Sequence, residues 1–299
     1  MEHATREGAP VAASRLEKAI LLAAVILPLV GTLYAIVLLW NRLVSWTDIA
    51  LLVGFYVLTA LGIGTGYHRM LTHRGFEAPA PVRAFWLILG SMALQGPAVE
   101  WAATHTKHHA KADTEEDPHT PLAGFWHAHT GWLFRDRIVR SGVWAKPFLA
   151  DPVVVWVDKT FFVWATLGFV IPFLIGGWTG LLWGGLVRVF LVHHVTWSVN
   201  SVCHMFGSRP FATKDESRNE WIVGLLALGE GWHNNHHAAP KVAIHGFRWW
   251  QVDVNGLIIR AMARLRLIRN VVRPTAEMRK GRRSDEAPAT VTLAALPRE

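Results

Sequence analysis

Long apolar segments constrain the fold of this chain more than any other feature of its sequence. A helix needs about 20 apolar residues to cross the hydrocarbon core of a bilayer, and residues 19–40 and 49–67 are uncharged runs of that kind. Residues 160–199 form a longer apolar run that only Arg188 interrupts, and Gly176-Gly177 near its middle favour a turn. We therefore expect two helices there, at 160–175 and 178–199, and four transmembrane helices in all.

The charges around these segments predict their orientation. Four spans place both termini on one side, and Arg42 is the only basic residue in a loop on the other side. Because loops rich in Lys and Arg stay in the cytoplasm, we expect both termini to be cytoplasmic. The shorter apolar run at 84–99 predicts an interfacial or buried helix.

Composition separates this chain from ordinary soluble proteins, with 52% hydrophobic and 17% charged residues. We expect a cytoplasmic N-terminal segment at 1–17, a membrane domain at 18–271 and a disordered tail at 272–299. The net charge of +8 favours anionic lipid head groups over nucleic acid, because the basic residues cluster around apolar spans and no nucleic-acid-binding motif occurs. The one cysteine, Cys203, excludes an intramolecular disulfide framework and is expected to pack between helices.

Nine histidines lie where the predicted spans meet the cytoplasmic face. They are His68, His73, His105, His108, His109, His204, His233, His236 and His237. They come from four separate stretches of the sequence, which suits convergence on one site. Histidine is the commonest metal ligand in its neutral form, so this convergence predicts a metal centre.

The spacing of these histidines supports metal binding. Residues at i, i+3 and i+4 share one face of a helix, and the pattern H-x-x-H-H occurs at 105–109 and again at 233–237. Asn200 and His204 form an i, i+4 pair. His68 and His73 differ, because five residues turn a regular helix by about 140°. We expect these two either to serve two metals or to lie where the helix unwinds.

Nine imidazoles exceed what one four- to six-coordinate ion uses, so the pattern predicts a dinuclear centre. The ligand type alone permits zinc, copper, iron or nickel. Asp117 and Glu230 lie close to the histidine motifs and are candidates to orient the rings; either could instead be a solvated loop carboxylate. His3 and His245 are expected at the surface. The other histidines are expected to be structural or to support the ligands: His119, His127, His129, His193 and His194.

The chain resembles the membrane fatty acid desaturases, in particular the bacterial form of the stearoyl-type Δ9 branch. The resemblance runs from about Phe55 to Asn255. It rests on the motifs A-L-G-I-G-T-G-Y-H-R-M-L-T-H-R, H-T-K-H-H followed by D-P-H and H-T-G-W, T-W-S-V-N-S-V-C-H, and G-E-G-W-H-N-N-H-H.

This resemblance implies an oxygen-dependent enzyme that introduces a cis double bond, expected at Δ9, into a saturated C16–C18 acyl chain. It implies two iron ions, with the nine histidines as ligands and Asn200 reaching one iron through water. The implied fold is four transmembrane helices beneath a cytoplasmic helical cap that holds the metal centre, in the inner membrane of a bacterium.

The resemblance also implies residues that contact the acyl chain. Tyr56 matches a position where a bulky residue closes the substrate tunnel, and Ala60 matches a small neighbour; the alternative for Tyr56 is an aromatic residue that only packs the helix. Trp197 matches a tryptophan beside bound substrate, and Arg137 a basic residue that binds phosphate. Ala103-Thr104 replace an Arg-Asp pair of the animal acyl-CoA enzymes. Acyl-CoA, acyl-lipid and acyl carrier protein therefore stay open as carriers.

Electrons are expected from a separate protein, because the chain carries no haem-binding H-P-G-G motif, cysteine set or dinucleotide fingerprint. A ferredoxin, a rubredoxin or a cytochrome b5-like donor should dock on the cytoplasmic face, where Lys107 and Lys111 suit an acidic partner. Two alternatives to a desaturase are a membrane di-iron hydroxylase acting on lipids or alkanes, and a metal-binding membrane carrier. The position of the histidines at one end of uncharged spans argues against the carrier.

Overall fold

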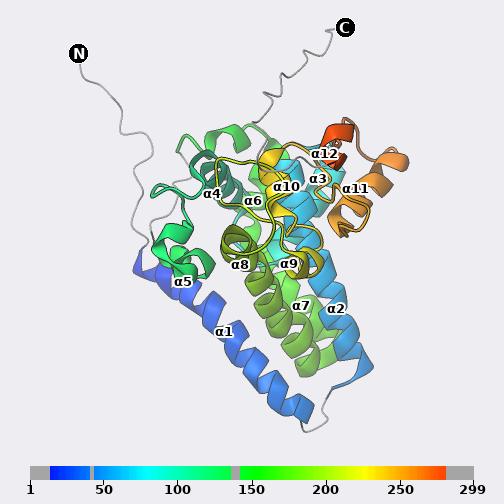
Figure 1. The fold of residues 1–299 in the computed structure, drawn as a ribbon. Coiled ribbons are helices and arrows are strands. Elements are labelled where there is room, and N and C mark those ends of the chain that lie inside the picture. The colour runs from blue at the N-terminus through cyan, green and yellow to red at the C-terminus, as the bar shows by residue number, and fades with distance from the viewer. Residues whose placement is uncertain (1–13, 41–43, 136–141, 281–299) are drawn as a thin grey trace, which may run out of the picture.

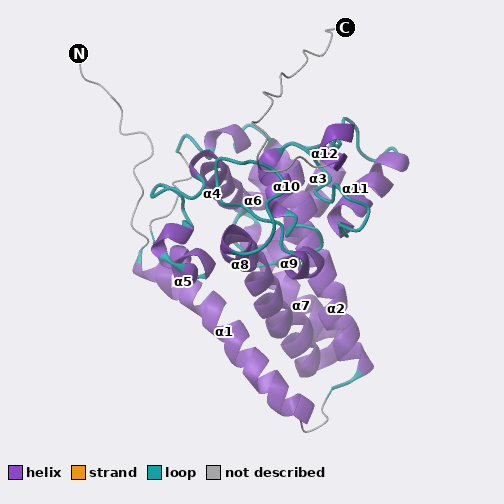
Figure 2. Ribbon diagram, in the orientation of Figure 1, coloured by secondary structure: helices purple, strands orange, loops and turns teal. Residues whose placement is uncertain are grey.

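Helices form the regular structure of this protein in the part that the computed structural model describes, residues 14–40, 44–135 and 142–280 (Figure 2). Within these ranges, β pairing is limited to three isolated bridges. The expected all-α class is therefore confirmed for the described residues.

Three continuous helical stretches are long and apolar enough to cross a membrane: Arg15–Leu39, Trp46–Thr72 and Phe161–Met205. The first corresponds to α1 (Arg15–Trp40). The second joins α2 (Trp46–Leu61) to η1 (Gly62–Thr72), and the third joins α7 (Phe161–Gly180), η5 (Leu181–Val187) and α8 (Arg188–Met205). The third stretch contains both of the segments expected at 160–175 and 178–199.

The third stretch reverses its direction at Gly177. The backbone of this residue is not helical, with φ +61° and ψ −146°, and glycine adopts positive φ without steric cost. Beyond the turn, η5 packs back on α7, where a Cβ on Gly184 would lie 2.9 Å from the Cβ of Pro172. The η5 helix consequently runs back along α7, and α8 continues from η5 toward the other end of the long helices (Figure 1). The turn expected at Gly176-Gly177 is confirmed.

Shorter helices gather near one end of the long ones and form a cap there (Figure 1). The cap contains α3 (Ala80–Met92), α4 (Ala98–Lys111), α5 (Phe125–His129), α6 (Pro152–Lys159), α9 (Trp221–Leu226), α10 (His233–Ala238), α11 (Val254–Arg264) and α12 (Ala276–Lys280). Short 3₁₀ turns, η2 (Pro121–Ala123), η3 (Gly131–Phe134) and η4 (Lys146–Phe148), lie between them.

Two expectations about secondary structure need correction. The apolar run at 84–99 is not one helix, because Leu94 and Gly96 have positive φ and separate α3 from α4. The tail expected to be disordered from residue 272 contains α12 in its described part, and residues 281–299 lie outside the described ranges.

The second stretch ends in a π-helix, η1, whose backbone bonds join residues five apart. The amide of His73 donates to the carbonyl of His68 at 3.1 Å. Glycines in η1 allow α3 to approach its backbone, since a Cβ on Gly66 would lie 2.7 Å from the carbonyl oxygen of Trp86.

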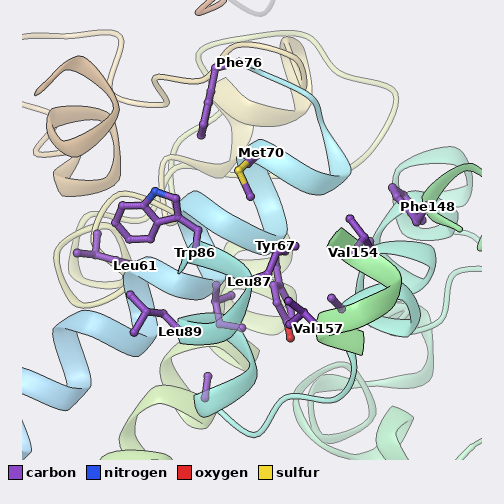
Figure 3. Close-up of a cluster of buried hydrophobic side chains, with 14 of the residues drawn as sticks. Leu61, Tyr67, Met70, Phe76, Trp86, Leu87, Leu89, Phe148, Val154 and Val157 are labelled. Carbon is purple, nitrogen blue, oxygen red and sulfur yellow. The ribbon is translucent and has the colours of Figure 1, made fainter. Parts of the chain in front are cut away.

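A hydrophobic core fills the space between η1, α3 and α6 (Figure 3). Tyr67 of η1 and Leu87 of α3 are fully buried, and Val154 and Val157 of α6 pack into the same cluster. The hydroxyl of Tyr67 shares a hydrogen bond with Ser91 Oγ at 2.9 Å, so its polar end is not left unpaired. This packing holds η1 in place.

A buried arginine joins the long helices to α3. Arg188 is 0% exposed, and its guanidinium donates to the carbonyls of Gly168 and Met92, both at 2.6 Å. The carbonyl of Gly168 has no helical donor because residue 172 is a proline, and Met92 ends α3, where carbonyls lack helical partners. Arg188 therefore replaces two missing helix hydrogen bonds.

The role of Arg188 predicts a specific coupling. Arg188→Met should lower the free energy of unfolding by about 2–4 kcal/mol, because two buried carbonyls lose a donor, measured as a reduced thermal midpoint in detergent. The loss should be smaller in a Pro172→Ala background, where residue 172 regains the N–H that Gly168 lacks. Equal losses in the two backgrounds would contradict this account.

Candidate metal centre

The nine histidines that the sequence singled out converge at the cap end of the long helices. His68 lies in η1, and His73 directly follows it. The remaining seven come from three helices: α4 carries His105, His108 and His109, α8 carries His204, and α10 carries His233, His236 and His237. Their ring nitrogens form two groups.

The first group contains five histidines whose ligand nitrogens all lie within 4.8 Å of one another: His68, His73, His105, His109 and His236. Nε2 atoms face each other at 3.0 Å between His68 and His236, at 3.0 Å between His73 and His105, and at 2.9 Å between His109 and His236.

The second group contains four buried histidines within the same distance limit: His108, His204, His233 and His237. Nε2 of His204 lies 3.0 Å from Nε2 of His233, and Nε2 of His108 lies 3.4 Å from Nε2 of His237. Two separate groups match the expectation of two metal ions, although ligation by these particular residues stays a prediction.

Carboxylates determine which ring nitrogens face inward. Nδ1 of His108 donates to Asp117 at 3.0 Å, Nδ1 of His204 to Asp113 at 3.0 Å, and Nδ1 of His237 to Asp215 at 2.9 Å. A proton on Nδ1 leaves Nε2 with a lone pair.

This arrangement of lone pairs tests whether the groups suit a metal. Nε2 of His108 and Nε2 of His237 face each other at 3.4 Å, and because both rings donate from Nδ1, their two lone pairs repel each other. A cation between them removes the repulsion and uses the nitrogens as ligands, which is the usual geometry of metal-binding histidine. The second group therefore fits a metal, and the first group offers five histidine nitrogens that all lie within 4.8 Å of one another.

Glu230 joins the first group to a buried ion network. It accepts from Nδ1 of His68 at 2.5 Å and from Arg69 at 2.8 Å, and Arg69 also pairs with Asp253 at 2.9 Å. Burial alone would raise the pKa of Glu230, but the charge of Arg69, followed by those of His68 and His245, holds that pKa well below its ordinary value. The carboxylate is therefore ionised where His68 needs an acceptor.

Burial controls the protonation of the rings outside the long helices. It lowers the pKa of His109 to about 3, with the neighbouring His68 as a further cause. The same burial raises the pKa of Asp117 to about 6, against the backbone N–H groups of Asp113 and His119. Neutral imidazoles are the form that binds metal.

The structure resolves how His68 and His73 act together. The π-helical bond from His73 to His68 brings residues five apart to one side, and both rings belong to the first group. The expectation that the helix departs from regular geometry here is confirmed. Which metal each of the two rings would serve stays a prediction.

The histidines outside the two groups differ in their surroundings. His245 was expected at the surface, which is wrong: it is 1% exposed and lies 3.4 Å from Glu230. His119 is buried beside His108, with ring centroids 4.2 Å apart. His129 bonds to His194 at 3.0 Å, and His193 to the carbonyl of Ala93 at 2.9 Å. His127 is half-buried, and His3 lies outside the described residues.

Two cavities meet at the first group. One of about 50 Å³ is lined by Tyr56 and Ala60 together with His68, and it also reaches Asn200 and His233. The other, of about 150 Å³, lies between α1, η3 and α8 and includes Trp197 and Leu133. Residues shared by both linings make the two cavities neighbours: Trp101, His105, Thr196 and Asn200.

The residues expected along the acyl chain are therefore divided between the two cavities. Tyr56 and Ala60 line the first cavity and Trp197 lines the second. The hydroxyl of Tyr56 donates to the carbonyl of Leu226 at 2.6 Å, which holds the ring in place. Arg137 lies outside the described residues, although Arg135 lines the second cavity.

Comparison with known proteins identifies the family. A family model described as fatty acid desaturase matches residues 43–253. The chain is 40% identical over 231 residues to an sn-1 stearoyl-lipid 9-desaturase of Anabaena variabilis, covering 76% of this chain and 85% of that protein. The chain belongs to the fatty acid desaturase family.

Other relatives show how far function varies among similar desaturases. A hex-5-enoyl-[acyl-carrier protein] acetylenase of Moorena producens is 38% identical over 274 residues, covering 85% of each chain. An acyl-CoA C20 Delta5-desaturase of Anemone leveillei is 37% identical over 251 residues, covering 82% of this chain and 80% of that protein. The family assignment makes this chain a desaturase-type oxidoreductase.

Several residues of this desaturase centre were missed by sequence reasoning. Asp113 and Asp215 orient His204 and His237, and Arg69 holds Glu230. Asp113 stands four residues after His109, beside the predicted Asp117, so its position was a usable signal. Asp215 lies in the loop between α8 and α9 with no motif around it, and only the fold brings it to His237.

Removing an orienting carboxylate should weaken metal binding. Asp117→Asn should lower metal affinity by about 10–100-fold, because His108 loses the acceptor that fixes its tautomer; metal content after dialysis against a chelator measures this. Glu116→Gln is the matched control, since that neighbouring carboxylate is exposed and pairs with Lys111. Equal metal retention in the two variants would exclude the orienting role.

Acid should destabilise the metal-free desaturase. Burial lowers the folded-state pKa of His109 to about 3, below the unfolded value of about 6.5. The unfolded state therefore binds more protons below pH 6.5, and stability is lost as pH falls. We expect the thermal midpoint of metal-free protein to drop below about pH 6.5. His109→Gln should flatten that drop, and a midpoint independent of pH between 4 and 7 would oppose the prediction.

Proposed function

We propose that this desaturase introduces a cis double bond at Δ9 of a saturated C16–C18 acyl chain. The observation that carries the proposal is the cavity that runs from Tyr56 to the first histidine group. The named activity of the Anabaena relative, an sn-1 stearoyl-lipid 9-desaturase, supports the position and the chain length. The relatives named for Δ5 and acetylenic products make the position the part that most needs testing.

Two irons would be held by the two histidine groups, five histidines in the first and four in the second. Asn200 lines both cavities beside His105 and would reach one iron through water. When bound, such a pair of irons with oxygen supplies the oxidising power that unactivated C–H bonds require. Oxygen would take two electrons from the two C–H bonds and two from an external donor, with protons, to form two waters.

The residues of this chain would contribute position and exclusion of water. Ala60 and Gly64 line the cavity with little side chain, which leaves room for methylenes beside His68. Tyr56 would close the far end, because its hydroxyl is tied to Leu226 and its ring cannot swing away without breaking that bond. A rigid cavity of this kind presents one C–C bond to the centre.

The membrane arrangement proposed for this function follows from the fold. The third apolar stretch turns at Gly177 and so would cross twice, giving four crossings with α1 and the α2–η1 helix. Both described ends of the chain and the metal groups lie at the cap end of these helices (Figure 1). We place that end in the cytoplasm, where a ferredoxin, rubredoxin or cytochrome b5-like donor would supply electrons.

Expression in a host that lacks its own desaturase tests the function directly. Fatty-acid profiling by chain length and double-bond position should show a cis Δ9 alkene on C16–C18 chains. A hydroxylated chain without an alkene would overturn desaturation, and another double-bond position would overturn Δ9. The lipid class that carries the first labelled product distinguishes acyl-CoA, acyl-lipid and acyl-carrier-protein substrates.

Tyr56 provides a sharper test of the cavity. Tyr56→Ala should shift the product profile toward longer chains, because the ring that closes the cavity is gone. Tyr56→Phe is the matched control, since it keeps the ring, loses only the bond to Leu226 and should keep the wild-type chain-length profile. An unchanged profile in Tyr56→Ala would remove Tyr56 from the acyl path.

A further inference from the structure

The C-terminal part of the described chain has a strong excess of positive over negative charge. Residues 241–280 contain nine Lys and Arg and two Asp and Glu, a net charge of +7 against +8 for all 299 residues. Asp253 is buried and paired with Arg69, so it offers no negative charge to the surface. Arg248, Arg260 and Arg264 form no ion pair with the part of the chain that the structure describes.

Exposed apolar side chains accompany these arginines. Trp249 is 96% exposed and Leu265 is 70% exposed. Trp250 and Leu257 are also exposed. We define the C-terminal surface as these four apolar side chains with four basic ones: Trp249, Trp250, Leu257, Leu265, Arg248, Arg260, Arg264 and Arg266.

Helix α11 separates a packed face from this surface. Asn255, Ile259 and Met262 are buried, and Met262 accepts a hydrogen bond from Trp86 of α3. Leu257 and Arg264 lie on the outer side and are exposed. The helix is therefore amphipathic, and its outer face mixes leucine with arginine, a composition typical of helices that lie in the plane of a membrane interface.

Two hydrogen bonds show where this surface lies along the second apolar stretch, Trp46–Thr72. Tyr56 bonds to Leu226 at the end of α9, and Thr65 bonds to Asn255 in the first turn of α11 at 2.7 Å. Helix α9 of the cap thus reaches as far as Tyr56, near the middle of the Trp46–Thr72 helix, whereas α11 lies beside the cap end of that helix. Trp232 links α9 to the segment that precedes α11: a Cβ on Gly224 of α9 would lie 3.1 Å from its ring, the ring contacts Trp250, and its indole N–H donates to the carbonyl of Val252 at 2.7 Å.

The types of exposed side chain change along the same direction, from α9 to α11. Helix α9 exposes only apolar large side chains, Trp221, Ile222, Leu225 and Leu226. The arginines begin at Arg248 and continue through α11. Apolar side chains lie beside the middle of a membrane-length helix, and tryptophan and then arginine follow toward its end. This order matches the layers of a bilayer, from hydrocarbon through the interface to the head groups.

We infer that the C-terminal surface binds the head groups of anionic phospholipids, with α11 lying in the bilayer interface. The arginines attract the phosphates and the extra negative charge of an anionic leaflet, while Trp249 and Leu257 insert at the boundary of the hydrocarbon. The inference does not depend on the reaction or on the acyl substrate. An acidic electron donor would also be attracted to the arginines. The large exposed apolar side chains that continue from the spanning helix, however, match lipid rather than the surface of an acidic protein.

A label on the C-terminal surface tests the inference. Trp249→Cys can be labelled with an environment-sensitive dye, because Cys203, the chain's single cysteine, is buried. The full chain is placed in nanodiscs of phosphatidylcholine alone or with phosphatidylglycerol. We expect a blue-shifted emission that is larger with phosphatidylglycerol. Val252→Cys, which keeps both tryptophans, gives a second label position if the first variant folds poorly, and a dye at Lys214→Cys should stay aqueous.

Variants that remove arginine charges test whether the response to anionic lipid depends on the C-terminal surface. Arg260→Gln with Arg264→Gln should weaken the response to phosphatidylglycerol by on the order of tenfold in titration. Lys214→Gln with Arg218→Gln removes the same charge elsewhere and should leave the response unchanged. Identical spectra in neutral and anionic discs, or an unaffected Arg260/Arg264 variant, would overturn the inference. It would also be overturned if an acidic soluble protein protects the dye while phosphatidylglycerol has no effect.

Discussion

The structure depends on burying many imidazoles at one place without leaving the lone pairs of their nitrogens to repel one another. Carboxylates accept the Nδ1 protons of His68, His108, His204 and His237, so the Nε2 lone pairs turn inward. Lone pairs that face each other repel unless a proton or a metal cation lies between them. We therefore expect the folding of the cap around these rings to be coupled to the binding of metal, as in other metal centres whose ligands come from separate elements.

The long helices and the histidine set could be predicted from the sequence, because both are local patterns. Apolar length predicted α1, the α2–η1 helix and the hairpin at Gly177, and helical spacing predicted the rings of α4 and α10. The pairing of His68 with His73 was left open, since a π-helix depends on how closely α3 packs against Gly62 and Gly66. Nothing local distinguishes that helix from a regular one.

The missed residues are those that only tertiary contacts bring to the centre. Arg69 reaches Glu230 and Asp253 across more than 160 positions of sequence, and Asp215 reaches His237 from a loop without a motif. His245 looked like a surface residue because a lone histidine carries no pattern. These contacts form the outer layer of the site, where the chain fixes the orientation of the rings.

We propose that nine histidines in two groups hold two metal ions. X-ray absorption at the iron edge, together with elemental analysis of the purified protein, tests it most directly. We expect two irons per chain. The first shell around each iron should consist of nitrogen, with imidazole scattering and no sulfur. One iron per chain, or a first shell dominated by carboxylate oxygen, would contradict it.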